Sequence, residues 1–155
     1  MVSVWEIGRV MKRLHDINIV IGIGIFAFVA IVAYWICWFV SPEVIQARTP
    51  ADPDFAIYSA YELAFPLPDA VTALAALIGV IGLWRMKDWG FLFMLLAAGA
   101  TFFLGLEDLL FDLENQMFVP FNGTAVIELA IVLLIMSLGP ITTILLWRRR
   151  RDLIT

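Results

Sequence analysis

Residues 17–40 read INIVIGIGIFAFVAIVAYWICWFV, without one Asp, Glu, Lys or Arg. This stretch exceeds the roughly 20 apolar residues with which an α-helix crosses about 30 Å of hydrocarbon. Three further apolar stretches of similar length follow, at residues 65–84, 89–111 and 124–147. Hydrophobic residues make up 63% of the chain, more than a soluble domain carries. The sequence therefore predicts an all-α, polytopic membrane protein, with residues 1–155 forming one bundle of four transmembrane helices.

Basic residues are distributed unequally between the connections. Nine of the ten fall before the first stretch, between the second and third, or after the fourth: Arg9, Lys12, Arg13, Arg85, Lys87 and Arg148 to Arg151. Because positive residues stay cytoplasmic during insertion, we expect both termini to be cytoplasmic, in the cell membrane if the chain is prokaryotic. The arginines after the last span are typical of a topological anchor, so no nucleic-acid partner is expected.

Two segments flanking the spans have their own patterns. Residues 1–16 alternate apolar and basic side chains at near-helical spacing, which predicts an amphipathic helix lying on the inner membrane surface. Pro66 and Pro68 interrupt the apolar run before the second span. Because proline is tolerated in a first helical turn, we favour a span beginning at Pro66, after a short re-entrant or interfacial helix at 55–64. The alternative is one longer helix from Phe55 that kinks at the prolines.

Acidic residues gather near the outer ends of the last three spans. Asp69 and Glu128 lie about one turn into their spans, Glu107 and Asp108 lie about one turn before the end of theirs, and Asp112 and Glu114 follow. At 1.5 Å per residue these carboxyl groups fall within about 6–8 Å of one plane. Small residues share their helix faces, so we expect the acids to point into the bundle. The alternative is a set of separate interfacial carboxylates, with Asp69 capping a helix N-terminus.

Buried acids persist when a proton, a cation or hydrogen bonds compensate their charge. Arg48 is the single basic residue on that side, and imidazole is absent there because His15 precedes the first span. We therefore expect no cofactor, no transition-metal site and no Ser–His or Cys–His catalytic pair. Proton transfer by paired carboxyls stays open, so the sequence does not decide whether the protein is an enzyme.

Aromatic residues accompany the acids on the loop side. They form either a wall suited to a lipophilic cation or an ordinary interfacial belt. The predicted ligand-binding residues are Glu62, Asp69, Glu107, Asp108, Glu128, Tyr61 and Trp38.

Two segments resemble the EXPERA-domain family, in its sigma-2 receptor-like branch. Residues 62–68, ELAFPLP, are similar to that family's Glu-x-x-Phe-x-Leu-Pro motif, and Phe102-Phe103-Leu104 with Glu107-Asp108 resembles the end of its next helix. The resemblance implies binding of sterol-like or lipophilic amine ligands between four helices, and in some members sterol isomerisation by intramembrane acids. The first span here lacks an acid comparable to the family's amine-binding carboxylate. The chain equally resembles uncharacterised small four-helix membrane proteins of prokaryotes, which implies no activity.

Three functional hypotheses follow. The first is a binding protein or isomerase-like enzyme for a lipid, or for a lipophilic or cationic small molecule, at an acidic intramembrane pocket near the outer leaflet. The second is a cation or proton transporter, which the scarcity of polar groups in the inner halves disfavours. The third is an assembly subunit or homo-oligomer that packs through Ala97, Thr101 and Gly105, small residues spaced four apart.

Overall fold

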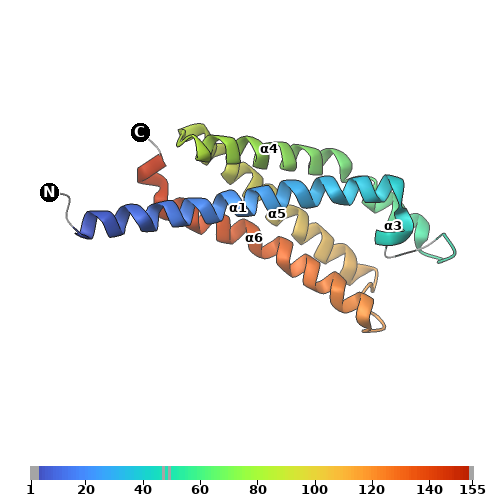
Figure 1. Cartoon of the computed structure of the whole chain (residues 1–155). Coiled ribbons are helices and arrows are strands. Elements are labelled where there is room, and N and C mark those ends of the chain that lie inside the picture. The colour runs from blue at the N-terminus through green and yellow to red at the C-terminus, as the bar shows by residue number, and fades with distance from the viewer. Residues whose placement is uncertain (1–3, 47, 49, 154–155) are drawn as a thin grey trace.

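The computed structural model describes residues 4–46, 48 and 50–153, and these residues form helices joined by turns and loops (Figure 1). The elements are α1 (Val4–Val40), α2 (Pro42–Ile45), α3 (Phe55–Glu62), α4 (Pro66–Trp84), α5 (Asp88–Glu114) and α6 (Gly123–Leu153). Four segments are long and apolar enough to cross a membrane, namely His15–Val40, Phe55–Trp84, Asp88–Glu114 and Ala125–Leu153. The predicted all-helical chain with four potential spans is therefore confirmed for the described residues.

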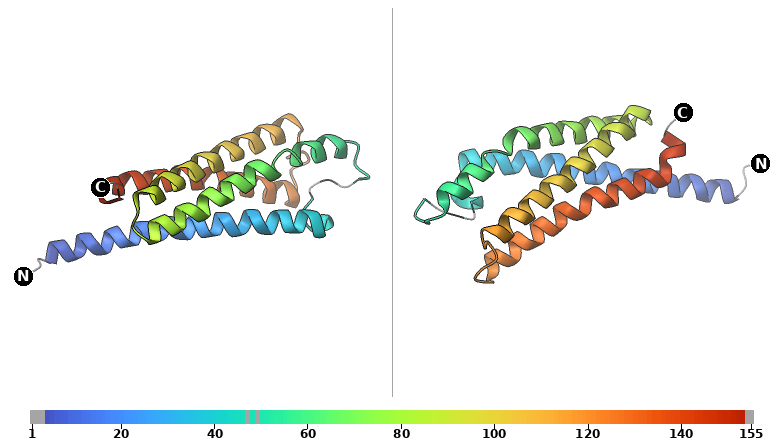
Figure 2. Two further views of the ribbon diagram at one scale, coloured as in Figure 1. Left: turned by 90° about the horizontal axis from the view of Figure 1, so that it is seen from above. Right: turned by 180° about the vertical axis from the view of Figure 1, so that it is seen from behind.

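The long helices form one elongated bundle. α5 packs against α4 and α6, and α1 packs against the same two helices (Figure 2). The start of α1, the α4–α5 turn and the end of α6 lie toward the same end of the bundle (Figure 1). We call this the basic end, because Arg85, Lys87 and Arg148–Arg151 belong to it. The opposite end, with α3 and the α5–α6 loop, is called the acidic end.

The first helix is longer than the sequence pattern suggests. α1 runs without interruption from Val4 to Val40, so no break at Ile17 separates a surface segment from the span. Residues 1–3 of the predicted amphipathic segment lie outside the described residues. The chain leaves α1 at Ser41, because Pro42 has no N–H with which to continue the helix.

The helix boundary near the two prolines follows the first of the two interpretations. α3 ends at Glu62, and α4 begins at Pro66 after a turn. Pro66 and Pro68 both occupy the first turn of α4, where a missing N–H costs nothing. Asp69 lies in the same turn, where the helix dipole favours a negative charge.

The interior of the bundle changes along its length. Large apolar side chains fill the basic end: Ile17, Val20, Leu83, Phe91, Met94, Leu146 and Leu153. Alanines replace them near the middle, where Ala75, Ala76 and Ala97 form a second buried cluster. Near the acidic end the buried side chains include the aromatic residues Trp38 and Tyr58 and the acid Asp112.

Small residues let the helix backbones approach closely. A Cβ added to Gly82 of α4 would overlap the backbone of Gly90 of α5, so this pair fixes the tight hairpin between them. The predicted seam on α5 packs in the same way, because a Cβ on Gly105 would lie 2.9 Å from Met136 of α6. The seam is therefore used inside this chain, between α5 and its neighbours.

Candidate functional site

Three of the predicted acids accept hydrogen bonds from aromatic side chains of other helices. Tyr34 Oη donates to Glu62 Oε2 at 2.8 Å, Trp35 Nε1 donates to Asp69 Oδ2 at 2.8 Å, and Tyr61 Oη donates to Asp108 Oδ1 at 3.1 Å. Each bond is partly buried and joins two elements: α1 to α3, α1 to α4, and α3 to α5. Asp69 and Asp108 thus face neighbouring helices, the direction that the small residues on their helix faces indicate.

The aromatic donors are packed as well as hydrogen-bonded. The Tyr61 ring stacks on Phe111 of α5, with centroids 3.8 Å apart and planes 6° from parallel. Trp38 is 5% exposed and lies 5.9 Å from the Tyr58 ring of α3. Trp38 and Tyr58 therefore belong to the protein interior, and the interfacial-belt interpretation does not hold for them. These contacts hold α3 against the turns of α1 and α5 at the acidic end.

The remaining acids differ sharply in exposure. Glu107 and Glu114 are exposed, and Glu107 lies about 100° around α5 from Asp108. Glu128 of α6 is half-buried. Asp112 of α5 is only 4% exposed, and its Oδ2 has no hydrogen-bond partner. Asp112 was not among the predicted ligand-binding residues, although its spacing of four from Asp108 placed it on the inward face.

A polar pocket of about 160 Å³ lies at the acidic end, between the α5–α6 loop, the start of α6 and the loop after α2. Its lining residues are Arg48, Met117, Val119, Pro120, Asn122, Ala125 and Glu128. An engineered protein cavity of about 150 Å³ admits benzene, so this pocket has room for a small organic group. Glu128 is the one predicted site residue that lines it.

Arg48 enters the pocket with most of its hydrogen-bonding capacity unused. Its terminal NH2 group lies 3.5 Å from the sulfur of Met117, which is a weak acceptor. Its Nε is buried and has no partner. Among the side chains that the structure describes, this Nε and Oδ2 of Asp112 are the two buried nitrogen or oxygen atoms without a hydrogen bond. One belongs to a guanidinium group, which donates hydrogen bonds, and the other to a carboxyl group, which accepts them when ionised.

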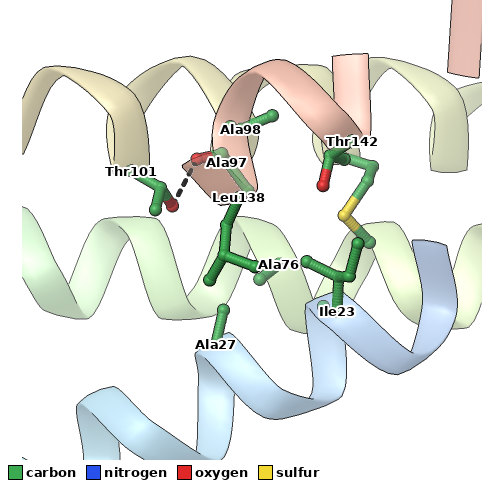
Figure 3. A pocket seen from close by; sticks show the side chains of 11 residues that line it. Ile23, Ala27, Ala76, Ala97, Ala98, Thr101, Leu138 and Thr142 are labelled. Atoms are coloured by element: carbon green, nitrogen blue, oxygen red, sulfur yellow. Dashed lines mark hydrogen bonds between the residues drawn. The ribbon is translucent and has the colours of Figure 1, made fainter. Parts of the chain in front are cut away.

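A second pocket, deeper in the bundle, is far smaller. It has a volume of about 20 Å³, enough for a single water molecule, and small side chains from α1, α4 and α5 line it with residues of α6 (Figure 3). Thr101, one of its polar side chains, already donates to the carbonyl oxygen of Ala97 at 2.9 Å. This pocket does not reach the acids, because none of them lines it.

The acids do not form a metal-binding group. In the described ranges, no three Asp, Glu, His or Cys side chains stand close enough together to hold a metal ion. The carboxyl groups of Asp69, Asp108 and Glu128 still act electrostatically on Glu62, so acids of four helices lie near one another. Beside them lies the pocket that Arg48 and Glu128 line. Five inward-facing acids nevertheless accompany a single cation at this end, since residues 14–84 and 88–147 contain no Lys or Arg other than Arg48.

Comparison of the chain with protein-family models, with curated proteins and with solved structures finds no match.

Proposed function

We propose that this protein binds a small molecule with a cationic group at the acidic end of the bundle, within reach of the lipid phase. The observation that carries the proposal is Asp112, a residue that is 4% exposed and has one buried carboxyl oxygen without a partner. Leaving a buried charged group unsatisfied costs more than about 1–3 kcal/mol. A cationic ligand would supply the missing donor.

The surrounding charges support the same class of ligand. The carboxylates of Asp108 and Glu128 act electrostatically on Asp112, so negative charge accumulates around it. A cation near these groups relieves their mutual repulsion. Glu128 also lines the pocket of about 160 Å³, which offers the ligand space beside the acids. The EXPERA-like segments favour a lipophilic amine, because that family binds such ligands.

We further propose that the acidic end faces away from the cytoplasm and that both termini are cytoplasmic, in the cell membrane if the chain is prokaryotic. The distribution of basic residues supports this orientation. A ligand would then reach the pocket from the outer leaflet or from the outer aqueous phase.

The test is ligand-dependent stability of the purified protein in dodecyl maltoside. N,N-dimethyloctylamine should raise the thermal midpoint, whereas farnesol, cholesterol and octanoate should leave it unchanged, since only the amine offers a cation. Asp112→Asn should raise the midpoint of the free protein, because it removes an unsatisfied buried charge, and should abolish the response to the amine. Glu114→Gln, an exposed acid nearby, is the matched control and should respond like the wild type. An amine response that persists in both Asp112→Asn and Glu128→Gln would refute the proposal.

The structure gives less support to the hypotheses of an assembly subunit and of a transporter. The seam of Ala97, Thr101 and Gly105 packs within the chain, so it does not offer a surface to a partner. The middle of the bundle holds a cavity for about one water, which supports a binding site at one end better than a conducting path.

A further inference from the structure

Arg48 and Glu128 place opposite charges on the wall of one pocket. We infer that the ligand is zwitterionic: it carries a phosphate or carboxylate group a few bonds away from its ammonium group. This inference rests on the proposed function, since it takes the cationic group as given and adds an anionic one. The shared chemistry belongs to lipid headgroups such as phosphoethanolamine and to small soluble zwitterions.

The guanidinium of Arg48 provides the anion-binding side. Its Nε is buried without a partner, and its NH2 group has only the Met117 sulfur. Nε and a terminal nitrogen of arginine form a planar fork that matches two oxygens of a phosphate or carboxylate. A purely cationic ligand would leave this fork unsatisfied, so it should bind more weakly than a zwitterion.

The carboxylate of Glu128 provides the cation-binding side. It lines the pocket, and it is near enough to Asp112 to act on that carboxyl group electrostatically. An ammonium group offers three donors, which suit acceptors on more than one side chain.

The two pocket charges do not neutralise each other directly. In the part of the chain that the structure describes, Arg48 and Glu128 line the pocket without forming a salt bridge, while the one salt bridge found joins Arg149 to Asp16 at the other end. Two opposite charges that line one pocket of about 160 Å³ without pairing are what a compact zwitterion requires. A single-charge ligand satisfies only one of them.

The test compares three probes by isothermal titration calorimetry in dodecyl maltoside: O-phosphoethanolamine, ethanolamine and inorganic phosphate. We expect O-phosphoethanolamine to bind about ten- to a hundredfold more tightly than ethanolamine, because one hydrogen-bonded charge pair is gained. Arg48→Gln should erase this difference. Arg48→Lys keeps the charge but lacks the Nε donor, so it should restore only part of the difference. Arg85→Gln, an exposed arginine at the basic end, is the matched control and should bind like the wild type.

A competition experiment with lipids identifies whether the zwitterion is a lipid headgroup or a soluble molecule. Phosphatidylethanolamine added to the micelles should compete with O-phosphoethanolamine if the headgroup of a lipid is the ligand, whereas phosphatidylglycerol, which has no amine, should not. Competition supports a lipid, and binding of the soluble probe without competition supports a soluble zwitterion.

Other results would overturn the inference. Equal affinity for ethanolamine and O-phosphoethanolamine, with binding of both lost in Glu128→Gln, refutes the zwitterion and leaves the proposed function standing. A double-mutant cycle showing strong coupling between Arg48 and Glu128 without any probe also refutes it, because the two would then neutralise each other. Absence of binding by every amine refutes the inference and the proposed function together.

Discussion

Tyr34 of α1 donates a hydrogen bond of 2.8 Å to Glu62 at the last residue of α3. α3 has eight residues and is too short to be stable as an isolated helix. Its position therefore depends on side chains that reach other helices. Glu62 binds α1, Tyr58 packs on Trp38 of α1, and Tyr61 binds α5. The acids near α3 consequently have a structural task whether or not they also serve a ligand.

Tyr34→Phe should destabilise the protein by about 1 kcal/mol, because Glu62 loses its donor while the aromatic ring remains. Hydrogen bonds between membrane helices average about 0.6 kcal/mol in double-mutant cycles and reach about 1.7. Denaturant unfolding of Tyr34→Phe, Glu62→Gln and the double variant measures the coupling. A coupling energy of zero would show that this bond does not hold α3.

Tyr61 makes two separable contacts, a hydrogen bond to Asp108 and a stack on Phe111. Tyr61→Phe removes only the hydroxyl and should cost about 0.6–1.7 kcal/mol. Tyr61→Leu removes the stack as well, and an aromatic pair adds about 0.5–1.5 kcal/mol beyond its buried area. Thermal unfolding should therefore rank wild type above Tyr61→Phe and Tyr61→Phe above Tyr61→Leu. Equal midpoints for the two variants would contradict the stacked geometry.

Gly82→Ala should destabilise the bundle, since the added Cβ overlaps the backbone of Gly90 and α4 must move away from α5. Gly99→Ala on α5 is the matched control, because nothing lies within 4 Å of its Cβ position. There the substitution should be neutral or stabilising by up to about 1 kcal/mol from helix propensity alone. Thermal midpoints of the two variants that shift in the same direction would count against the close α4–α5 contact.

The helices could be predicted from the sequence because their signal is local. A run such as residues 17–40 needs only its own length and hydropathy, and Pro66 marks a helix start through its missing N–H. Which face of a helix meets a neighbour depends on residues that are distant in the sequence. Gly22 and Gly24 look alike in the sequence, yet only Gly24 has side chains of α4 and α5 within contact distance of its Cβ position.

The candidate site was only partly predictable, for the same reason. The inward direction of Asp69 and Asp108 follows from small residues at helical spacing, but their partners Trp35 and Tyr61 depend on how the helices are rotated and stacked. Tyr34 and Trp35 end an apolar span, and an interfacial belt explains that pattern equally well. Arg48 lies in a loop, where no periodicity indicates that its guanidinium turns into a pocket.

Arg149 of α6 and Asp16 of α1 form a salt bridge of 2.7 Å near the basic end. Both side chains are mostly buried, at 16% and 14% exposure, so their attraction is less screened than that of a surface pair. We expect a coupling energy near or above about 1 kcal/mol, the upper end for exposed pairs. A double-mutant cycle with Asp16→Asn and Arg149→Gln measures it. Arg148→Gln, an exposed neighbour, is the control and should change stability by less than Arg149→Gln.

Orientation in the membrane can be tested with single cysteines. Cys37 is the only native cysteine, so Cys37→Ala gives a thiol-free background. Lys87→Cys places a thiol in the exposed α4–α5 turn at the basic end, and Glu114→Cys places one at the exposed end of α5. Because basic connections stay cytoplasmic, a membrane-impermeant maleimide added to intact cells should label only the Glu114→Cys variant. After permeabilisation both variants should react, which controls for accessibility. Labelling of Lys87→Cys in intact cells would show that the orientation is the opposite one, with the Arg48–Glu128 pocket on the cytoplasmic side.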